Sequence, residues 1–203
     1  MFLGKFKDES GTSAIEFACY IFIFTLMCGL MIDISSSVIK KGQLERVNNS
    51  LMAILRERND FYNGRINFSK EDVEQLDNIA NVLLADSDGT VEPHQLTIRM
   101  IEFSPDSTSD NKIRGLERTF STIVVAGCDY QTGTKTSIDT LSNLSAWGVP
   151  PTAKQNATNP FWYPVYEITL CVPGAVSYFH QMIGGFKKNM SSLNIRNVAI
   201  PRI

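Results

Sequence analysis

Residues 11–32, Gly11-Thr12-Ser13-Ala14-Ile15-Glu16 followed by FACYIFIFTLMCGLMI, decide how this chain is built. The apolar part, Phe17 to Ile32, contains no charged side chain. A bilayer core requires about 20 residues, so this run alone is slightly short. Ser35 to Ile39 extend it, and Lys40 and Lys41 can anchor its end at a membrane surface. One membrane-spanning helix is therefore expected, and the sequence shows no second candidate.

A short leader precedes this segment. It holds Lys5 and Lys7 and ends in Gly11, so a cut between Gly11 and Thr12 would leave the apolar segment in the mature chain. An ordinary secretory signal is cut after its apolar region. The cut would make Glu16 the fifth residue, where a carboxylate at the edge of the hydrocarbon is costly unless it is paired or protonated. Glu16 is therefore a candidate functional residue; the alternative is a signal anchor with Glu16 at the headgroup boundary.

The composition suits one membrane helix and one globular domain. The chain has 203 residues, 43% hydrophobic and 20% charged, and its net charge of −2 gives no electrostatic reason to expect nucleic acid. His94 and His180 fit no metal-ligand spacing, and no phosphate loop or nucleophile motif occurs. Asp86-Ser87-Asp88-Gly89 reads as a turn, because Thr97 stands where a calcium loop needs glutamate. We therefore expect no catalytic residue, metal site or cofactor.

The cysteines form two groups. Cys19 and Cys28 lie in the apolar run, whereas Cys128 and Cys171 lie in the remainder, 43 positions apart. The second pair can form one disulfide if this region is exported, or remain two buried free thiols. Basic residues flank the span on both sides, so they do not fix its orientation. A disulfide would place the region outside the cytoplasm, and it is the outcome that we predict.

The helical pattern continues beyond the membrane segment. Leu44, Val47, Leu51 and Leu55 recur at three- and four-residue spacing, which predicts one long helix, half in lipid and half amphipathic, ending near residue 60. Gly42 is a possible weak point in that helix, because glycine costs about 1 kcal/mol relative to alanine. The Asn63-Gly64 pair marks the break after it.

A second helix and several short strands are expected afterwards. Ser69 and Asp72 form a start signal, and an apolar helix face follows: Val73, Leu76, Ile79, Ala80 and Leu83. Strands are predicted at residues 96–100, Phe120–Ala126, Val165–Val172 and Leu193–Ile200, with a short helix at Ala175–Ile183. The stretches 104–115 and 132–159 read as loops, and Trp147 and Trp162 can pin the second. This second loop is either a displayed variable surface or a packed connection. The fold class is α+β, with helices first and an antiparallel sheet after.

The residues Gly11 to Ala18 and the apolar run behind them resemble the processing and assembly region of type IV pilin-like proteins. Among these, the chain most resembles the TadE/TadF minor pseudopilins of the tight-adherence (Tad, or Flp) pilus, and TadF in particular. The specific match covers about the first 60 residues. The resemblance implies a leader at 1–11, a transmembrane and amphipathic helix at 12–60 and a pilin-like periplasmic α+β domain at 61–203.

The resemblance also implies partners and a place in the cell. A prepilin peptidase would recognise Gly11 and make Thr12 the new N-terminus. Glu16 would set the register between the subunit and its neighbour. The chain would be a single-pass inner-membrane protein and no enzyme, working with other minor and major pilins and the inner-membrane assembly platform in pilus assembly and adherence. Two alternatives are a minor pseudopilin of a type II secretion system and an uncleaved, membrane-anchored periplasmic binding domain.

Overall fold

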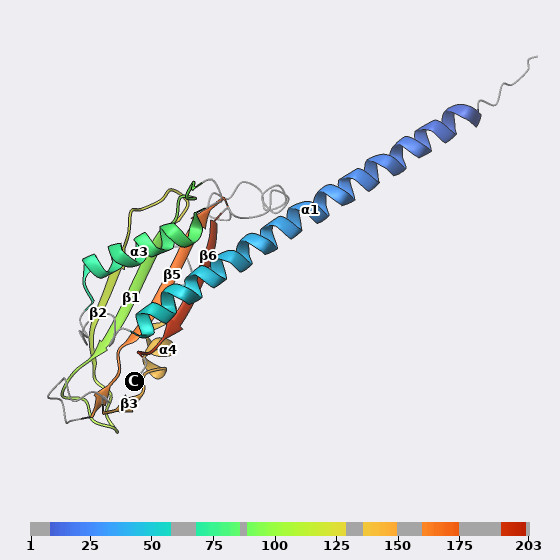
Figure 1. Ribbon diagram of the computed structural model, residues 1–203. Coiled ribbons are helices and arrows are strands. Elements are labelled where there is room, and N and C mark those ends of the chain that lie inside the picture. Colours follow the sequence, from blue (N-terminus) through green and yellow to red (C-terminus); the bar gives the residue numbers. More distant parts are fainter. Residues whose placement is uncertain are drawn as a thin grey trace, which may run out of the picture.

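A computed structural model describes residues 9–57, 68–85, 89–128, 136–149, 160–174 and 192–201. Its first element is α1 (Glu9–Arg56), a helix of 48 residues and about 72 Å. The first part of α1 projects away from every other element, and only its last part packs on the rest of the chain (Figure 1). Leu44, Val47, Leu51 and Leu55 are buried there, which confirms the predicted amphipathic continuation.

The projecting part of α1 is an unbroken helix whose hydroxyl groups bond to its own backbone. The hydroxyls of Thr25, Ser35, Ser36 and Ser37 each donate to a carbonyl three or four residues earlier, at 2.7–3.0 Å. These hydrogen bonds satisfy the hydroxyl groups without a partner from outside the helix. Gly42 does not interrupt the helix.

The second helix, α3 (Lys70–Leu84), begins as the sequence predicts. Ser69 and Asp72 bond to each other's backbone N–H groups in a capping box. Val73, Leu76 and Ala80 are buried, but Leu83 is 45% exposed and Leu84 packs against the core instead. The predicted apolar face was wrong at this last position, because the helix turns its final residue rather than Leu83 towards the sheet.

Four antiparallel strands form the sheet in the order β2-β1-β5-β6. They are β1 (Gln95–Phe103), β2 (Arg114–Ser121), β5 (Val165–Pro173) and β6 (Ser192–Ala199). The last part of α1 and all of α3 cover one face of this sheet (Figure 1), and the main core lies between them. The α+β class and the strands near 96–100, 165–172 and 193–200 are confirmed.

The strand predicted at Phe120–Ala126 was wrong in position. The observed β2 ends at Ser121, and Ile123 and Val124 are 84% and 78% exposed. These apolar residues lie in a connection that turns at Gly127, which has a φ of +94°, and leads to Cys128. Apolarity alone therefore did not indicate burial here.

The predicted loop at 132–159 contains regular structure among its described residues. A short helix, α4 (Ile138–Asn143), follows the N-cap Ser137, and β3 (Trp147–Gly148) pairs with β4 (Phe161–Trp162). The rings of Trp147 and Trp162 are 5.4 Å apart, as expected for a connection pinned by aromatic contact. The predicted helix at Ala175–Ile183, the Asn63-Gly64 break and residues 86–88 of the expected turn lie outside the described residues.

Candidate assembly surface

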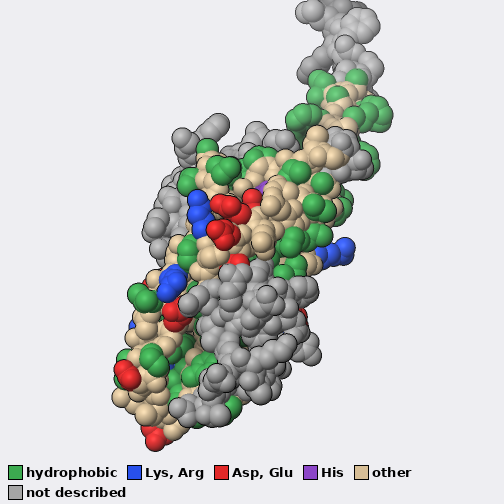
Figure 2. Space-filling model, turned by 60° about the vertical axis from the view of Figure 1, so that its left-hand side comes forward, with side chains coloured by type: hydrophobic (Ala, Val, Ile, Leu, Met, Phe, Trp, Pro, Cys, Tyr) green, Lys and Arg blue, Asp and Glu red, His purple; other side chains and the backbone are tan. Residues whose placement is uncertain are grey.

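The largest exposed apolar surface of the described chain is the projecting part of α1. Figure 2 shows hydrophobic side chains over the part of the helix that rises above the domain. Ile15, Phe17, Tyr20 and Phe24 are 66–72% exposed, and the helix is long and apolar enough to cross a membrane. A surface of this size in water is unfavourable, so a lipid phase or other apolar helices must cover it.

Gly11 and Thr12 lie in the first turn of this helix, because α1 begins at Glu9. The first four N–H groups of a helix have no intrahelical partner, so this turn opens more easily than a turn in the helix interior. Glycine weakens it further, because it gains most backbone freedom when a helix opens. An extended backbone at the Gly11–Thr12 bond therefore requires only the opening of the helix end.

Glu16 lies one helical turn after Thr12 and is exposed. No cation forms an ion pair with it within the described residues. Four residues of helix rise about 6 Å, so Glu16 stands within about one turn of the backbone at Thr12. The carboxylate is thus presented on the outside of the apolar surface, beside the backbone nitrogen that a cut would expose.

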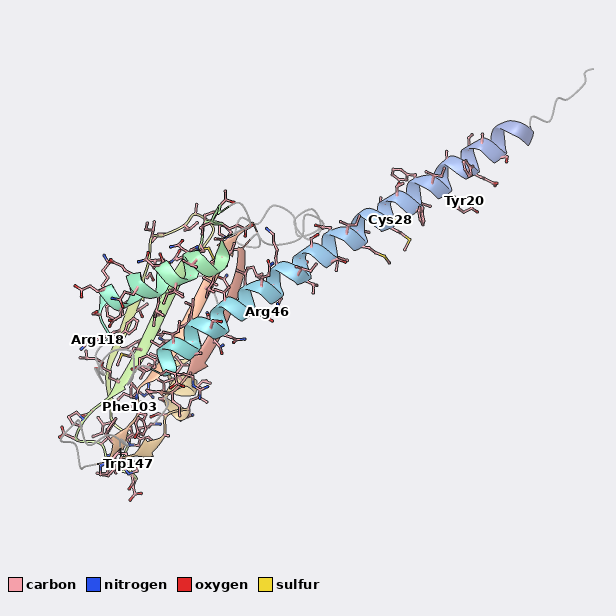
Figure 3. All side chains as sticks on the ribbon, in the orientation of Figure 1. Tyr20, Cys28, Arg46, Phe103, Arg118 and Trp147 are labelled. Carbon is pink, nitrogen blue, oxygen red and sulfur yellow. A yellow bond between two sulfur atoms is a disulfide. The ribbon has the colours of Figure 1, made fainter. Side chains whose placement is uncertain are left out.

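Cys128 and Cys171 are joined in a disulfide in this structure. Their Cα atoms lie 5.8 Å apart, within the usual range for such a bond, and both residues are buried. The bond ties the exposed connection after β2 to the central strand β5. Cys19 and Cys28, in contrast, are exposed free thiols of α1, and Figure 3 shows Cys28 on its projecting part.

A row of alternating charges crosses the face of the sheet opposite to α1, and the sequence analysis missed it. Arg99 on β1 contacts Glu117 on β2 at 2.6 Å and Glu167 on β5 at 3.4 Å, and Glu167 contacts Arg196 on β6 at 3.2 Å. Thr136 adds a hydrogen bond to Glu167 at 2.6 Å, and its carbonyl accepts one from Arg99 at 2.8 Å. The row links all four strands to the segment that leads into α4.

A second polar contact holds the end of the domain that lies farthest from the projecting helix (Figure 3). The Lys112 ammonium group lies 4.9 Å from the ring centre of Phe103 and 4.1 Å from that of Trp162, and it donates to the carbonyl of Ser142. Burial lowers the pKa of Lys112 below its ordinary value. Burial likewise raises the pKa of the nearby Tyr163 hydroxyl. Lys112 therefore connects the segment between β1 and β2 to Trp162 and to the end of α4.

The histidine that the structure describes is also held inside the fold. His94 is nearly buried, its Nε2 lies 3.3 Å from Asp77 Oδ1, and its Nδ1 lies 3.0 Å from the carbonyl oxygen of Glu92. His180 lies outside the described residues. Within the described ranges, no three His, Cys, Asp or Glu side chains are grouped so that they could hold a metal ion.

In the part of the chain that the structure describes, these features define a protein with one N-terminal helix long and apolar enough to cross a membrane, and an α+β domain packed on the end of that helix. The family of the tight adherence pilin protein F, TadF, matches residues 5–200, and the chain belongs to this family. No curated protein and no solved structure matches the chain.

Proposed function

We propose that this chain is a minor pseudopilin of a Tad pilus that a prepilin peptidase processes between Gly11 and Thr12. The observation that carries the proposal is the projecting part of α1: an uncovered apolar helix that begins at Glu9, just before the expected cut, and presents Glu16. Membership of the TadF family supports a tight-adherence machine over a type II secretion system. The chain would be a substrate of an enzyme and a structural subunit.

In this proposal the uncut helix first holds the chain in the inner membrane, with the α+β domain on the periplasmic side. A disulfide between Cys128 and Cys171 supports that side, because such bonds persist in oxidising compartments. The leader with Lys5 and Lys7 would then face the cytoplasm. The exposed surface of α1 would exchange lipid for the helices of other minor and major pilins at the assembly platform.

Glu16 has a specific task in this assembly. Cleavage converts the backbone nitrogen of Thr12 into an ammonium group at the edge of the hydrocarbon. A Glu16 carboxylate from a neighbouring subunit can pair with that group, and a low dielectric strengthens the attraction. Because an unpaired charge there is costly, the pair favours one register between subunits.

The test compares Glu16→Gln and Glu16→Ala with Glu45→Gln, a control on the same helix near its junction with the domain. We expect both Glu16 variants to be cleaved and inserted normally but to cross-link poorly to other pilus subunits and to give fewer surface fibres. The control should give wild-type amounts. Normal piliation in the Gln variant would show that charge pairing is dispensable, and normal piliation in the Ala variant would remove Glu16 from assembly altogether.

A further inference from the structure

A pocket of about 410 Å³ lies where α1 leaves the domain. Four polar side chains of α1 line one side of it: Lys40, Gln43, Arg46 and Ser50. Leu83 and Ala85 from the end of α3 line the other side, together with Glu92. Figure 3 places Arg46 on α1 between its projecting part and its packed end. The pocket therefore lies at the end of the domain nearest to the apolar helix.

The pocket carries an excess of positive charge. Lys40 is paired with Glu92 at 2.5 Å, and on the same stretch of helix Lys41 lies 3.8 Å from Glu45. Arg46 is exposed and forms no ion pair with any carboxylate of the described residues. Its guanidinium group is thus the cation that remains available, and a planar guanidinium suits a phosphate oxygen pair. The expected ligand is an anion that carries phosphate.

The distance of the pocket from the edge of the hydrocarbon indicates where that anion comes from. This step rests on the proposed membrane placement of α1, in which Lys40 marks the edge of the hydrocarbon. Arg46 lies six residues further, about 9 Å along the helix, and helical side chains lean back towards the N-terminus. The headgroup layer is about 5–8 Å thick. The Arg46 guanidinium group therefore reaches the headgroups, where lipid phosphate is concentrated.

Exposed apolar side chains beside the pocket favour a lipid over a free anion. Val82 and Leu83 at the end of α3 are 76% and 45% exposed. Val91, which is 39% exposed, is bridged to Ala85 of the pocket wall. A soluble phosphate gains nothing from such neighbours, whereas a lipid interface removes them from water.

We propose that this pocket binds the phosphate of an anionic phospholipid in the leaflet from which α1 emerges. Arg46 donates to the phosphate oxygens, and Gln43 lies in the same wall to supply a further donor. Leu83 and its apolar neighbours rest against the lipid. The bound lipid fixes the height of the α+β domain above the membrane and the rotation of α1 about its own axis.

The experiment uses the mature chain, with the whole of its apolar helix and its domain, in nanodiscs. These nanodiscs contain equal amounts of phosphatidylcholine and phosphatidylglycerol. Native mass spectrometry after mild detergent release counts the lipids that stay bound. We expect the wild type to retain phosphatidylglycerol preferentially and Arg46→Gln to retain about fivefold less, the factor expected for one basic residue at an anionic surface. Arg56→Gln removes an exposed charge near the other end of the helix and should match the wild type.

The outcomes separate this proposal from the proposed function. Equal retention by Arg46→Gln and the wild type would contradict the pocket, as would a wild type without preference between the two lipids. Release of the lipid by inorganic phosphate would show that phosphate alone suffices and would also contradict it. A wild-type chain that does not enter the nanodisc would contradict the membrane placement itself. Arg46 is exposed, so unchanged thermal unfolding of the variant excludes misfolding as the cause of a loss.

Discussion

Arg99 and Glu167 lie directly opposite each other on β1 and β5, with side chains 4% and 0% exposed. Two charges at such a depth lose their hydration, and their attraction offsets this cost only when both are well paired. Here Glu167 has three partners, Arg99, Arg196 and Thr136. The row of charges therefore depends on this carboxylate more than on Glu117, which is 38% exposed at one end.

Removal of Glu167 should destabilise the fold far more than removal of Glu117. We expect Glu167→Ala to lower the free energy of unfolding by about 3 kcal/mol or more, because Arg99 then keeps a buried charge with fewer partners. Glu117→Ala removes a partly exposed partner and should cost about 1 kcal/mol. Denaturant titration of the detergent-solubilised chain measures both values. Equal losses in the two variants would show that the buried pair has no special weight.

The disulfide should be present in protein from its native source. Closing a loop of 43 residues stabilises the fold by about 4 kcal/mol in the chain-entropy estimate. Peptide mapping by mass spectrometry without reduction should find Cys128 linked to Cys171. Alkylation of both cysteines in denatured, unreduced protein would show that the bond is absent and would remove the main support for the periplasmic side.

Single residues were predictable from sequence where their chemistry is local. Ser69 and Asp72 form a capping box within four residues, and the structure confirms it. The Arg99–Glu167 pair was missed because the two charges stand in different, mainly apolar strands, and the register that brings them together is set by the whole sheet. A charge in a buried strand was the available signal. Gly11, Thr12 and Glu16 remain predictions about processing and assembly.

At the scale of elements, α1 combines two environments in one continuous helix. Its last part buries Leu44, Leu51 and Leu55 against the sheet, and Asn48 adds a hydrogen bond to the carbonyl of Ile195 at 3.4 Å. Most residues of its first part are exposed. No break separates the two parts, because α1 is helical from Glu9 to Arg56.

The packing of α1 is tested with Leu51→Ala, which leaves a cavity at a fully buried position. We expect the free energy of unfolding to fall by about 2–5 kcal/mol. Leu83→Ala is the control, because this leucine is 45% exposed, and it should change stability by no more than about 0.5 kcal/mol. If Leu83→Ala cost as much as Leu51→Ala, the assigned face of α3 would be incorrect.

Elements with a strong period were predictable, and connections were not. The spacing of leucines predicted the long helix, and alternation predicted β1, because both patterns record one buried face. The strand predicted at Phe120–Ala126 was wrong because the apolar residues Ile123 and Val124 lie in an exposed connection that leads to the disulfide. The helix α4 was missed because six residues are too few to show a helical period.

At the scale of the whole molecule, the shape separates two tasks. The projecting half of α1 offers an apolar surface to lipid or to other helices, and the domain at its far end is held together by its own core, a disulfide and a row of charges. The resemblance of the first 60 residues to pilin-like proteins predicted this division. The family match over residues 5–200 extends it to nearly the whole chain.

In the proposed function, processing links the two tasks, because the cut removes the leader and leaves the apolar part of α1 in the mature chain. A bulky residue at the cut should prevent this. We expect Gly11→Leu to accumulate as uncut precursor, because the peptidase has to draw an extended backbone close to its own carboxylates and glycine presents no side chain. Ser13→Ala, two residues away in the same first turns of α1, should be processed like the wild type in an immunoblot that resolves precursor from mature chain.

The central claim, that the membrane helix is retained after the leader is removed, is tested most directly by the N-terminal residue of the chain. Protein extracted from membranes of cells with and without the prepilin peptidase is sequenced by Edman degradation. The account predicts Thr12 as the first residue when the peptidase is present and Met1 when it is absent. Wild-type protein that still begins at Met1 in peptidase-positive cells would contradict it.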